Sequence, residues 1–298
     1  MKARLIRIAA ATATSILAAG LQVQAFAADT LGQPTDGAID FQPAATALRQ
    51  QAMNFHTFIL LPVLFGISAL VLGLLLWCII RYNKRANQTP ARFTHNTAVE
   101  IAWTTVPVLI LLVIAIVSLR LLFDYHDMPA PYMTVKVTGY QWYWGYEYPD
   151  QKIAEQTSTM ATEQQAALDK VQYKLAATNP MVVPVGKVVR VLVTGADVIH
   201  SFSVNAFGVK VDAVPGRVNQ IWFKATTTGT FTGQCSQLCG IDHAFMPIEV
   251  KVLSQADFDA WVKSKAPKPP AATNAAAPTT AATTAVVQPA AAAAVAKP

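Results

Sequence analysis

Two long uncharged runs constrain the fold of this 298-residue chain more than any other feature of its sequence. Residues 58–80 contain no charged side chain, and as a helix they would extend roughly 34 Å at about 1.5 Å of rise per residue. A bilayer core is about 30 Å thick, so this run is long enough to cross it. A second uncharged run covers residues 101–119. The two runs predict a transmembrane hairpin over residues 55–123.

The first 27 residues have the pattern of a secretory signal peptide. Three basic residues within the first seven precede an apolar stretch, and Ala25-Phe26-Ala27 gives the small-x-small pattern that precedes signal cleavage. We therefore expect residues 1–27 to be a signal peptide and the polar residues 28–54 to form an exported, extended segment. The alternative is that the first stretch is a short additional membrane anchor.

The connector between the apolar runs predicts the orientation of the chain. Residues 81–99 carry four Lys or Arg and no acidic residue, which is typical of a cytoplasmic loop. The N-terminus and everything after residue 123 then lie on the opposite side. An exported N-terminus is also what a signal peptide requires, and a cleaved signal followed by two spans fits a multi-pass protein of a bacterial inner membrane, with its large domain in the periplasm.

Beyond residue 123 the pattern changes from continuous apolar runs to alternation. Period-two segments separated by Gly and Pro predict short strands, of which the clearest lie at residues 133–138, 188–193, 209–211 and 248–252. Such strands favour an all-β sandwich or barrel over residues 124–263. Residues 151–175 are rich in Ala, Gln and Glu and are expected to form a helical or loose insert. Residues 264–298 are a low-complexity tail rich in Ala, Pro and Thr.

The distribution of charge argues against nucleic-acid binding, although the net charge is +6. Much of the positive charge lies before the first apolar run and in the connector. Residues 124–263 contain 11 Lys or Arg and 13 Asp or Glu, which leaves a balance of −2. A slightly acidic domain of this kind favours a basic protein as its partner.

The chemistry of the chain is concentrated in one loop. Cys235, Cys239, His243 and Met246 fall within twelve residues, and His200 stands 35 residues before the first of them. These soft and borderline ligands suit copper better than hard cations. A mononuclear electron-transfer copper takes two His, one Cys and a weak axial Met. The second Cys therefore favours two copper ions bridged by two thiolates, each completed by one His and by either Met246 or a backbone carbonyl.

Other interpretations of the cysteines are open at this point. Two nearby Cys in an exported domain commonly form a disulfide. A zinc site built from Cys235, Cys239, His243 and His200 is chemically feasible, but it leaves Met246 without a role. The third cysteine, Cys78, lies inside an apolar run, where it is expected to be a small buried hydrophobe.

The loop resembles the dinuclear copper A loop of cytochrome c oxidase subunit II, Cys-x-x-x-Cys-x-x-x-His-x-x-Met. The resemblance extends from the first apolar run to about residue 263 and includes residues 139–144, 197–202 and 208–220. It implies a cupredoxin-like Greek-key β-barrel on two transmembrane helices. It also implies that two copper ions are ligated by His200, Cys235, Cys239, His243, Met246 and the backbone carbonyl of Gln237.

The same resemblance implies roles for residues outside the loop. From the sequence alone Trp142 is a packing residue, but its family counterpart is the exposed indole through which cytochrome c passes its electron. Glu100 matches the acid at the mouth of a proton-uptake path, and Asp197 matches an acid that docks cytochrome c. Gln237 departs from the family, which usually has Glu there as a ligand of magnesium at the interface with subunit I. An amide is a weaker ligand for a hard cation, so this magnesium site is in doubt.

The resemblance also implies the overall function. Such a subunit accepts electrons from cytochrome c and passes them to haem in subunit I, where oxygen is reduced to water with proton pumping; subunit III is a further partner. Two other classes remain. A membrane-tethered copper carrier or assembly factor also uses Cys-x-x-x-Cys with a distant His, generally on a thioredoxin-like fold. A quinol-oxidase type of subunit shares the fold but lacks the copper ligands.

Overall fold

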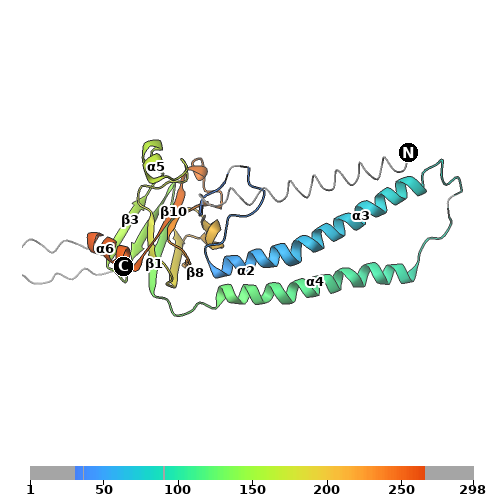
Figure 1. Ribbon diagram of the computed structural model, residues 1–298, viewed down its shortest axis with the longest axis horizontal. Coiled ribbons are helices and arrows are strands. Elements are labelled where there is room, and N and C mark those ends of the chain that lie inside the picture. Colours follow the sequence, from blue (N-terminus) through green and yellow to red (C-terminus); the bar gives the residue numbers. More distant parts are fainter. Residues whose placement is uncertain (1–30, 36, 90, 266–298) are drawn as a thin grey trace, which may run out of the picture. The chain divides into compact units, whose positions relative to one another are not determined.

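The computed structural model describes residues 31–35, 37–89 and 91–265. The predicted signal peptide and the tail from residue 266 onward lie outside this part of the chain. Figure 1 shows the elements with the labels used below.

Two long apolar helices occupy the predicted hairpin (Figure 1). The first is continuous from Ala47 to Arg81 and consists of α2 (Ala47–Phe55), a π-helical turn η2 (His56–Leu60) and α3 (Leu61–Arg81). The second is α4 (Thr97–His126). Their most apolar windows have mean hydropathies of 2.7 and 2.8 and contain no buried residue, so both helices are long and apolar enough to cross a membrane.

The first helix begins earlier than the sequence indicates. Residues 28–54 were expected to be extended, but the chain is helical from Ala47, so this prediction is wrong for its last eight residues. Thr46 caps the helix by accepting a hydrogen bond from the backbone N–H of Arg49, and Leu48 is buried. A polar sequence with a good N-cap can extend an apolar helix out of the bilayer because its side chains are solvated there.

The large domain consists of two five-stranded sheets. The first has the strand order β3-β2-β1-β5-β8 and the second has the order β4-β10-β9-β6-β7. Most neighbours are antiparallel, whereas β1 with β5 and β4 with β10 are parallel. The strands are β1 (Met133–Tyr140), β2 (Tyr143–Tyr148), β3 (Ile153–Ser158), β4 (Met181–Pro184), β5 (Val189–Gly195), β6 (His200–Val204), β7 (Val209–Ala213), β8 (Asn219–Phe223), β9 (Gly229–Cys235) and β10 (Pro247–Leu253). The four segments of alternating sequence are confirmed as strands.

One apolar core is formed by residues of both sheets. Along β5 buried and partly exposed residues alternate without interruption, as the period-two pattern requires. The largest fully buried side chains include Trp144, Phe202, Phe223 and Phe231, which come from four different strands. Cys235, Cys239 and Met246 belong to the same core cluster, so the ligand-bearing loop is packed against the sandwich.

The insert at residues 151–175 differs in part from the expectation. It contains the short helix α5 (Glu163–Asp169), but it begins with strand β3, which pairs with β2. The insert packs around a small cluster of its own. It is fixed to β10 where the carboxylate of Glu249 accepts a hydrogen bond from the backbone N–H of Ala177 at 2.7 Å. After β10 the domain ends in helix α6 (Gln255–Lys265), which the sequence analysis did not assign.

Candidate metal centre

The candidate ligands come together because two neighbouring strands end at the same edge of the second sheet. β6 begins at His200 and β9 ends at Cys235, and the two strands pair with Phe202 opposite Cys235. The chain then turns through Cys239 and the 3-10 helix η4 (His243–Phe245) before β10 begins at Pro247. Met246 immediately precedes β10, so its position is fixed by that strand.

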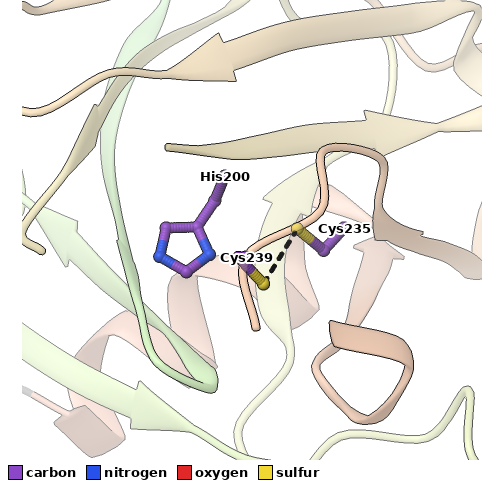
Figure 2. Close-up of side chains that lie close together, drawn as sticks. All are labelled: His200, Cys235 and Cys239. Atoms are coloured by element: carbon purple, nitrogen blue, oxygen red, sulfur yellow. Dashed lines mark hydrogen bonds between the residues drawn. The ribbon is translucent and has the colours of Figure 1, made fainter. Parts of the chain in front are cut away.

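The two cysteine sulfurs lie side by side but are not bonded to each other. Both residues are free and buried, and their Sγ atoms are 3.9 Å apart (Figure 2). A disulfide requires about 2.05 Å, so the disulfide interpretation does not describe this structure.

Three further groups surround the sulfurs. The Sγ of Cys239 lies 3.4 Å from the Sδ of Met246 and 3.5 Å from the Nδ1 of His243. The Sγ of Cys235 lies 3.3 Å from the carbonyl oxygen of Gln237. The structure therefore brings together all the candidate ligands of the loop.

His200 completes the group from the other strand. Its Nε2 lies 2.8 Å from the Oδ1 of Asp197, whereas its Nδ1 is buried and has no hydrogen-bond partner. Figure 2 shows one ring nitrogen of His200 facing the sulfur atoms. One ring nitrogen and the two sulfurs lie within 4.8 Å of one another and can hold a metal ion. A buried imidazole nitrogen without a partner is costly, and a metal ion is a partner that fits it.

Burial sets the protonation of this group. Desolvation, followed by the proximity of Cys235, raises the pKa of the Cys239 thiol to about 12. The thiol is thus protonated at neutral pH until a cation replaces the proton.

The carboxyl of Asp197 shifts in the opposite direction. Burial opposes its ionisation, but hydrogen bonds from His200 and from the backbone N–H groups of Val198 and Gln141 outweigh the effect of burial and lower the pKa of this carboxyl. Asp197 is therefore an ionised partner for the imidazole of His200.

Two tryptophans contact the group by their indole N–H groups. Trp144 is fully buried, and its Nε1 donates to the carbonyl oxygen of Met246 at 3.3 Å. Trp142 is only partly buried, and its Nε1 donates to the carbonyl oxygen of Cys239 at 3.3 Å. It lies in the turn before β2 and not on that strand.

Two further predicted residues are Glu100 and the side chain of Gln237. Glu100 lies in the first turn of α4, where its Oε1 accepts a hydrogen bond from the backbone N–H of Asn96 at 3.3 Å. This contact gives Glu100 a helix-capping role in addition to the predicted one. The side chain of Gln237 is exposed.

Sequence reasoning missed Gly139 and Gln141 as individual residues of the site. Both lie in the segment Gly-Tyr-Gln-Trp-Tyr-Trp at residues 139–144, which the resemblance included, but nothing in the spacing indicates that this hairpin reaches a loop about 100 residues later. The Nε2 of Gln141 donates to the carbonyl oxygen of Cys239 at 2.8 Å.

Fold and site together define a class: a cupredoxin-like domain on a membrane-spanning hairpin, with a group of two buried thiols, a buried thioether, one buried and one partly buried imidazole that can hold metal. Comparison with known proteins agrees with this class. Residues 34–121 match the family model for the transmembrane domain of cytochrome c oxidase subunit II, and residues 133–253 match the model for its periplasmic domain. The chain belongs to the cytochrome c oxidase subunit II family.

Individual relatives support the assignment over most of the chain. A cytochrome c oxidase subunit 2 from Cereibacter sphaeroides is 47% identical over 251 residues, covering 79% of this chain and 82% of the relative. One from Arabidopsis thaliana is 39% identical over 237 residues, covering 76% of this chain and 89% of the relative. Among solved structures, the periplasmic domain of subunit II of the cytochrome oxidase of Bradyrhizobium japonicum is 55% identical, covering 46% of this chain and 96% of that domain, with a TM-score of 0.43.

The predicted family and fold class are therefore confirmed. The chain is a membrane protein and a subunit of an oxidoreductase complex, and its partners include other subunits of a cytochrome c oxidase.

Proposed function

We propose that this chain receives electrons from cytochrome c at a dinuclear copper A centre and passes them to haem in subunit I, where oxygen is reduced to water with proton pumping. The observation that carries the proposal is the pair of buried, unbonded sulfurs of Cys235 and Cys239, 3.9 Å apart and faced by a free imidazole nitrogen. Two thiolates in this arrangement can each bridge the same two metal ions.

The loop and the start of β6 together provide the ligands that two coppers would need. Cys235 and Cys239 would hold them through thiolates, His200 and His243 through imidazoles, and Met246 and the carbonyl oxygen of Gln237 would be weaker ligands. When bound, a copper pair of this kind supplies reversible one-electron chemistry. Because both sulfurs are held by the packed end of a β-sandwich, the protein keeps the ligand positions nearly fixed between oxidation states.

Trp142 connects this buried group to the surface. Its indole is partly exposed and its Nε1 contacts the carbonyl oxygen of Cys239, so it provides a short covalent and hydrogen-bonded route from a docked protein to a bridging ligand. The acidic balance of residues 124–263 favours docking of a basic cytochrome c, and exposed acids steer such an encounter. Asp197 contributes to that field while its oxygens hold His200 and Gln141.

Two roles concern the rest of the complex. Glu100, in the first turn of α4, is proposed to stand at the mouth of a proton path into subunit I, and subunit III is proposed as a further partner. Gln237 offers an exposed amide where the family has a carboxylate, so we expect this chain to hold magnesium weakly at the interface with subunit I.

The competing copper-carrier function does not fit the fold. Carriers with Cys-x-x-x-Cys generally use alternating helices and strands, whereas the loop here closes a two-sheet sandwich. The chain is proposed to lie in a bacterial inner membrane with its large domain in the periplasm.

The proposal is tested on the full chain, purified in detergent and loaded with copper. Its copper content is measured and its electron paramagnetic resonance spectrum is recorded. We expect two coppers per chain and, in the oxidised form, one unpaired spin shared between two equivalent copper nuclei. A single mononuclear copper, a bound zinc or a Cys235–Cys239 disulfide in the protein isolated from its membrane would each contradict it.

A further inference from the structure

A two-residue hairpin turn of the first sheet reaches across to the candidate ligands. Tyr140 at the end of β1 pairs with Tyr143 at the start of β2, and their rings stack with centroids 4.6 Å apart. Gln141 and Trp142 are the two residues between them. Such a short turn, closed by a stacked pair of tyrosine rings, has little freedom to move.

One side of the turn is fixed to the strand that carries His200. The backbone N–H of Gln141 donates to the Oδ2 of Asp197 at 2.7 Å, and the Oδ1 of the same carboxylate lies 2.8 Å from the Nε2 of His200. Asp197 therefore holds the imidazole and the turn at the same time.

The other side of the turn is fixed to the cysteine loop. The Nε2 of Gln141 donates to the carbonyl oxygen of Cys239 at 2.8 Å, and the indole of Trp142 donates to the same oxygen at 3.3 Å. Gly240 follows with φ +128°, and a Cβ there would lie 2.9 Å from the indole and 3.1 Å from the Nε2 of Gln141. The loop backbone thus lies flush against the turn.

We propose that Gln141 is a positioning residue that ties two copper ligands, His200 and Cys239, to one another through the first sheet. His200 lies at the start of β6 and Cys239 in the loop after β9. Gln141 contacts the support of both, because its backbone N–H binds Asp197 and its side-chain amide binds the carbonyl oxygen of Cys239. It sets the distance between the imidazole and a bridging sulfur and holds Cys239 against Trp142. This inference rests on the proposed function, because it assigns Gln141 a role toward the copper pair.

The test uses the full chain in detergent, carrying Gln141→Ala or Gln141→Glu. Glutamate has nearly the same shape, but it offers no N–H to the carbonyl of Cys239. Loss of a residue that orients a ligand typically weakens metal binding about 10–100-fold, so we expect both variants to lose copper to a chelator at correspondingly lower concentrations. We also expect copper hyperfine couplings that differ from those of the wild type, because each variant releases Cys239, a proposed ligand of both coppers, while the backbone N–H of residue 141 still binds Asp197.

Gln165→Ala is the matched control, since Gln165 lies on the exposed face of α5 and its side-chain amide donates to Asp169 of the same helix at 2.9 Å. It is expected to leave affinity and spectrum unchanged. Circular dichroism of the metal-free proteins separates loss of folding from loss of positioning, and Gln141→Glu supplies the answer if Gln141→Ala does not fold. A folded Gln141→Glu protein could instead show the same hyperfine couplings and the same resistance to chelator as the wild type. That result would overturn the role of Gln141 while leaving the copper function intact. A wild-type chain without paired coppers would instead overturn the proposed function.

Discussion

Cys239 is the residue at which most interactions of the site meet. Its sulfur lies within 4 Å of the sulfurs of Cys235 and Met246 and of a ring nitrogen of His243, and its carbonyl oxygen accepts two hydrogen bonds. Side chain and backbone are thus held from opposite sides, which makes it the residue whose replacement is most informative.

Replacing Cys239 by Ser is expected to destroy the paired site. A hydroxyl is a poor ligand for copper and does not ionise near neutral pH, so one of the two bridges is lost. We expect bound copper to fall to one ion or fewer per chain and the shared-spin signal to disappear. Cys78→Ser is the control, because Cys78 lies on α3, where its side chain is exposed and not buried as the sequence analysis expected. Two coppers with an unchanged spectrum in the Cys239→Ser protein would contradict the bridging role.

Gly139 is expected to tolerate no side chain. A Cβ at this position would lie 2.9 Å from the Cγ and Cδ2 atoms of the His200 ring, which is itself fully buried. Overpacking of this kind costs about 1–3 kcal/mol, and here the strain falls on a candidate ligand. We expect Gly139→Ala to lower the free energy of unfolding of the metal-free protein by that amount in urea titration and to weaken copper binding.

Gly145→Ala is the comparison for that measurement. The added Cβ would meet the end of the Glu155 side chain, which is flexible and able to move. An equal loss of copper affinity in both variants would show that the contact of Gly139 with His200 is unimportant.

At the scale of single residues, the sequence predicts the metal ligands but not the residues that hold those ligands in place. Soft side chains at fixed spacing around Cys235 are informative because metal chemistry restricts which residues can occupy such positions. Nothing comparable marks Gln141, whose role arises from a contact with Cys239 that only the tertiary structure creates. Asp197 was predicted as a docking acid, and the structure adds that its carboxylate orients His200.

At the scale of elements, the insert depends on one buried acid. Glu249 on β10 is fully buried, and its carboxylate accepts from the backbone N–H of Ala177 and lies 3.5 Å from the Nζ of Lys251. Lys251 also lies 3.8 Å from Asp169 of α5. Burial raises the pKa of Glu249 above its ordinary value of 4.5, although the backbone hydrogen bond and Lys251 oppose the shift.

The raised pKa predicts a pH-dependent stability. Between pH 4.5 and the raised value, Glu249 binds more protons in the folded than in the unfolded chain, so its contribution to the free energy of unfolding falls as pH rises through that window. Glu249→Gln keeps an acceptor for Ala177 but cannot ionise. We expect the stability of wild type relative to this variant to decrease from acid to neutral pH, measured by denaturant titration at several pH values. A constant difference would show that Glu249 ionises alike in both states.

Element prediction succeeded where apolar and polar residues alternate along the sequence and failed where they do not. β5 alternates throughout and was predicted, whereas β3 is an edge strand of the first sheet whose central residues are exposed and polar. Hydrophobic periodicity is therefore absent from β3, and its pairing with β2 is what makes it a strand. Helix α6 was missed because its apolar residues are few; Phe258 is buried, and the ring of Trp261 packs against Tyr148 with centroids 5.0 Å apart.

At the scale of the whole molecule, the hairpin sets which side of the membrane each part can occupy. Two spans return the chain to the side from which it started, so the segment before α2 and the sandwich after α4 share one side and the connector of residues 82–96 lies on the other. From the positive charge of that connector we propose that it lies in the cytoplasm.

Chemical labelling tests this arrangement directly. In a Cys78→Ser chain with copper bound, single cysteines are introduced by Asn87→Cys, at a partly exposed position of the connector, and by Gln165→Cys, at an exposed position on α5. A thiol reagent that does not cross membranes is expected to label only Gln165→Cys in intact spheroplasts and both positions after lysis. The physical reason is that moving Lys84, Arg85 and Arg92 across the bilayer is opposed by the energetic cost of burying charge and by the membrane potential. Labelling of Asn87→Cys in intact spheroplasts would place the copper loop in the cytoplasm, out of reach of a periplasmic cytochrome c, and would contradict the proposed direction of electron flow.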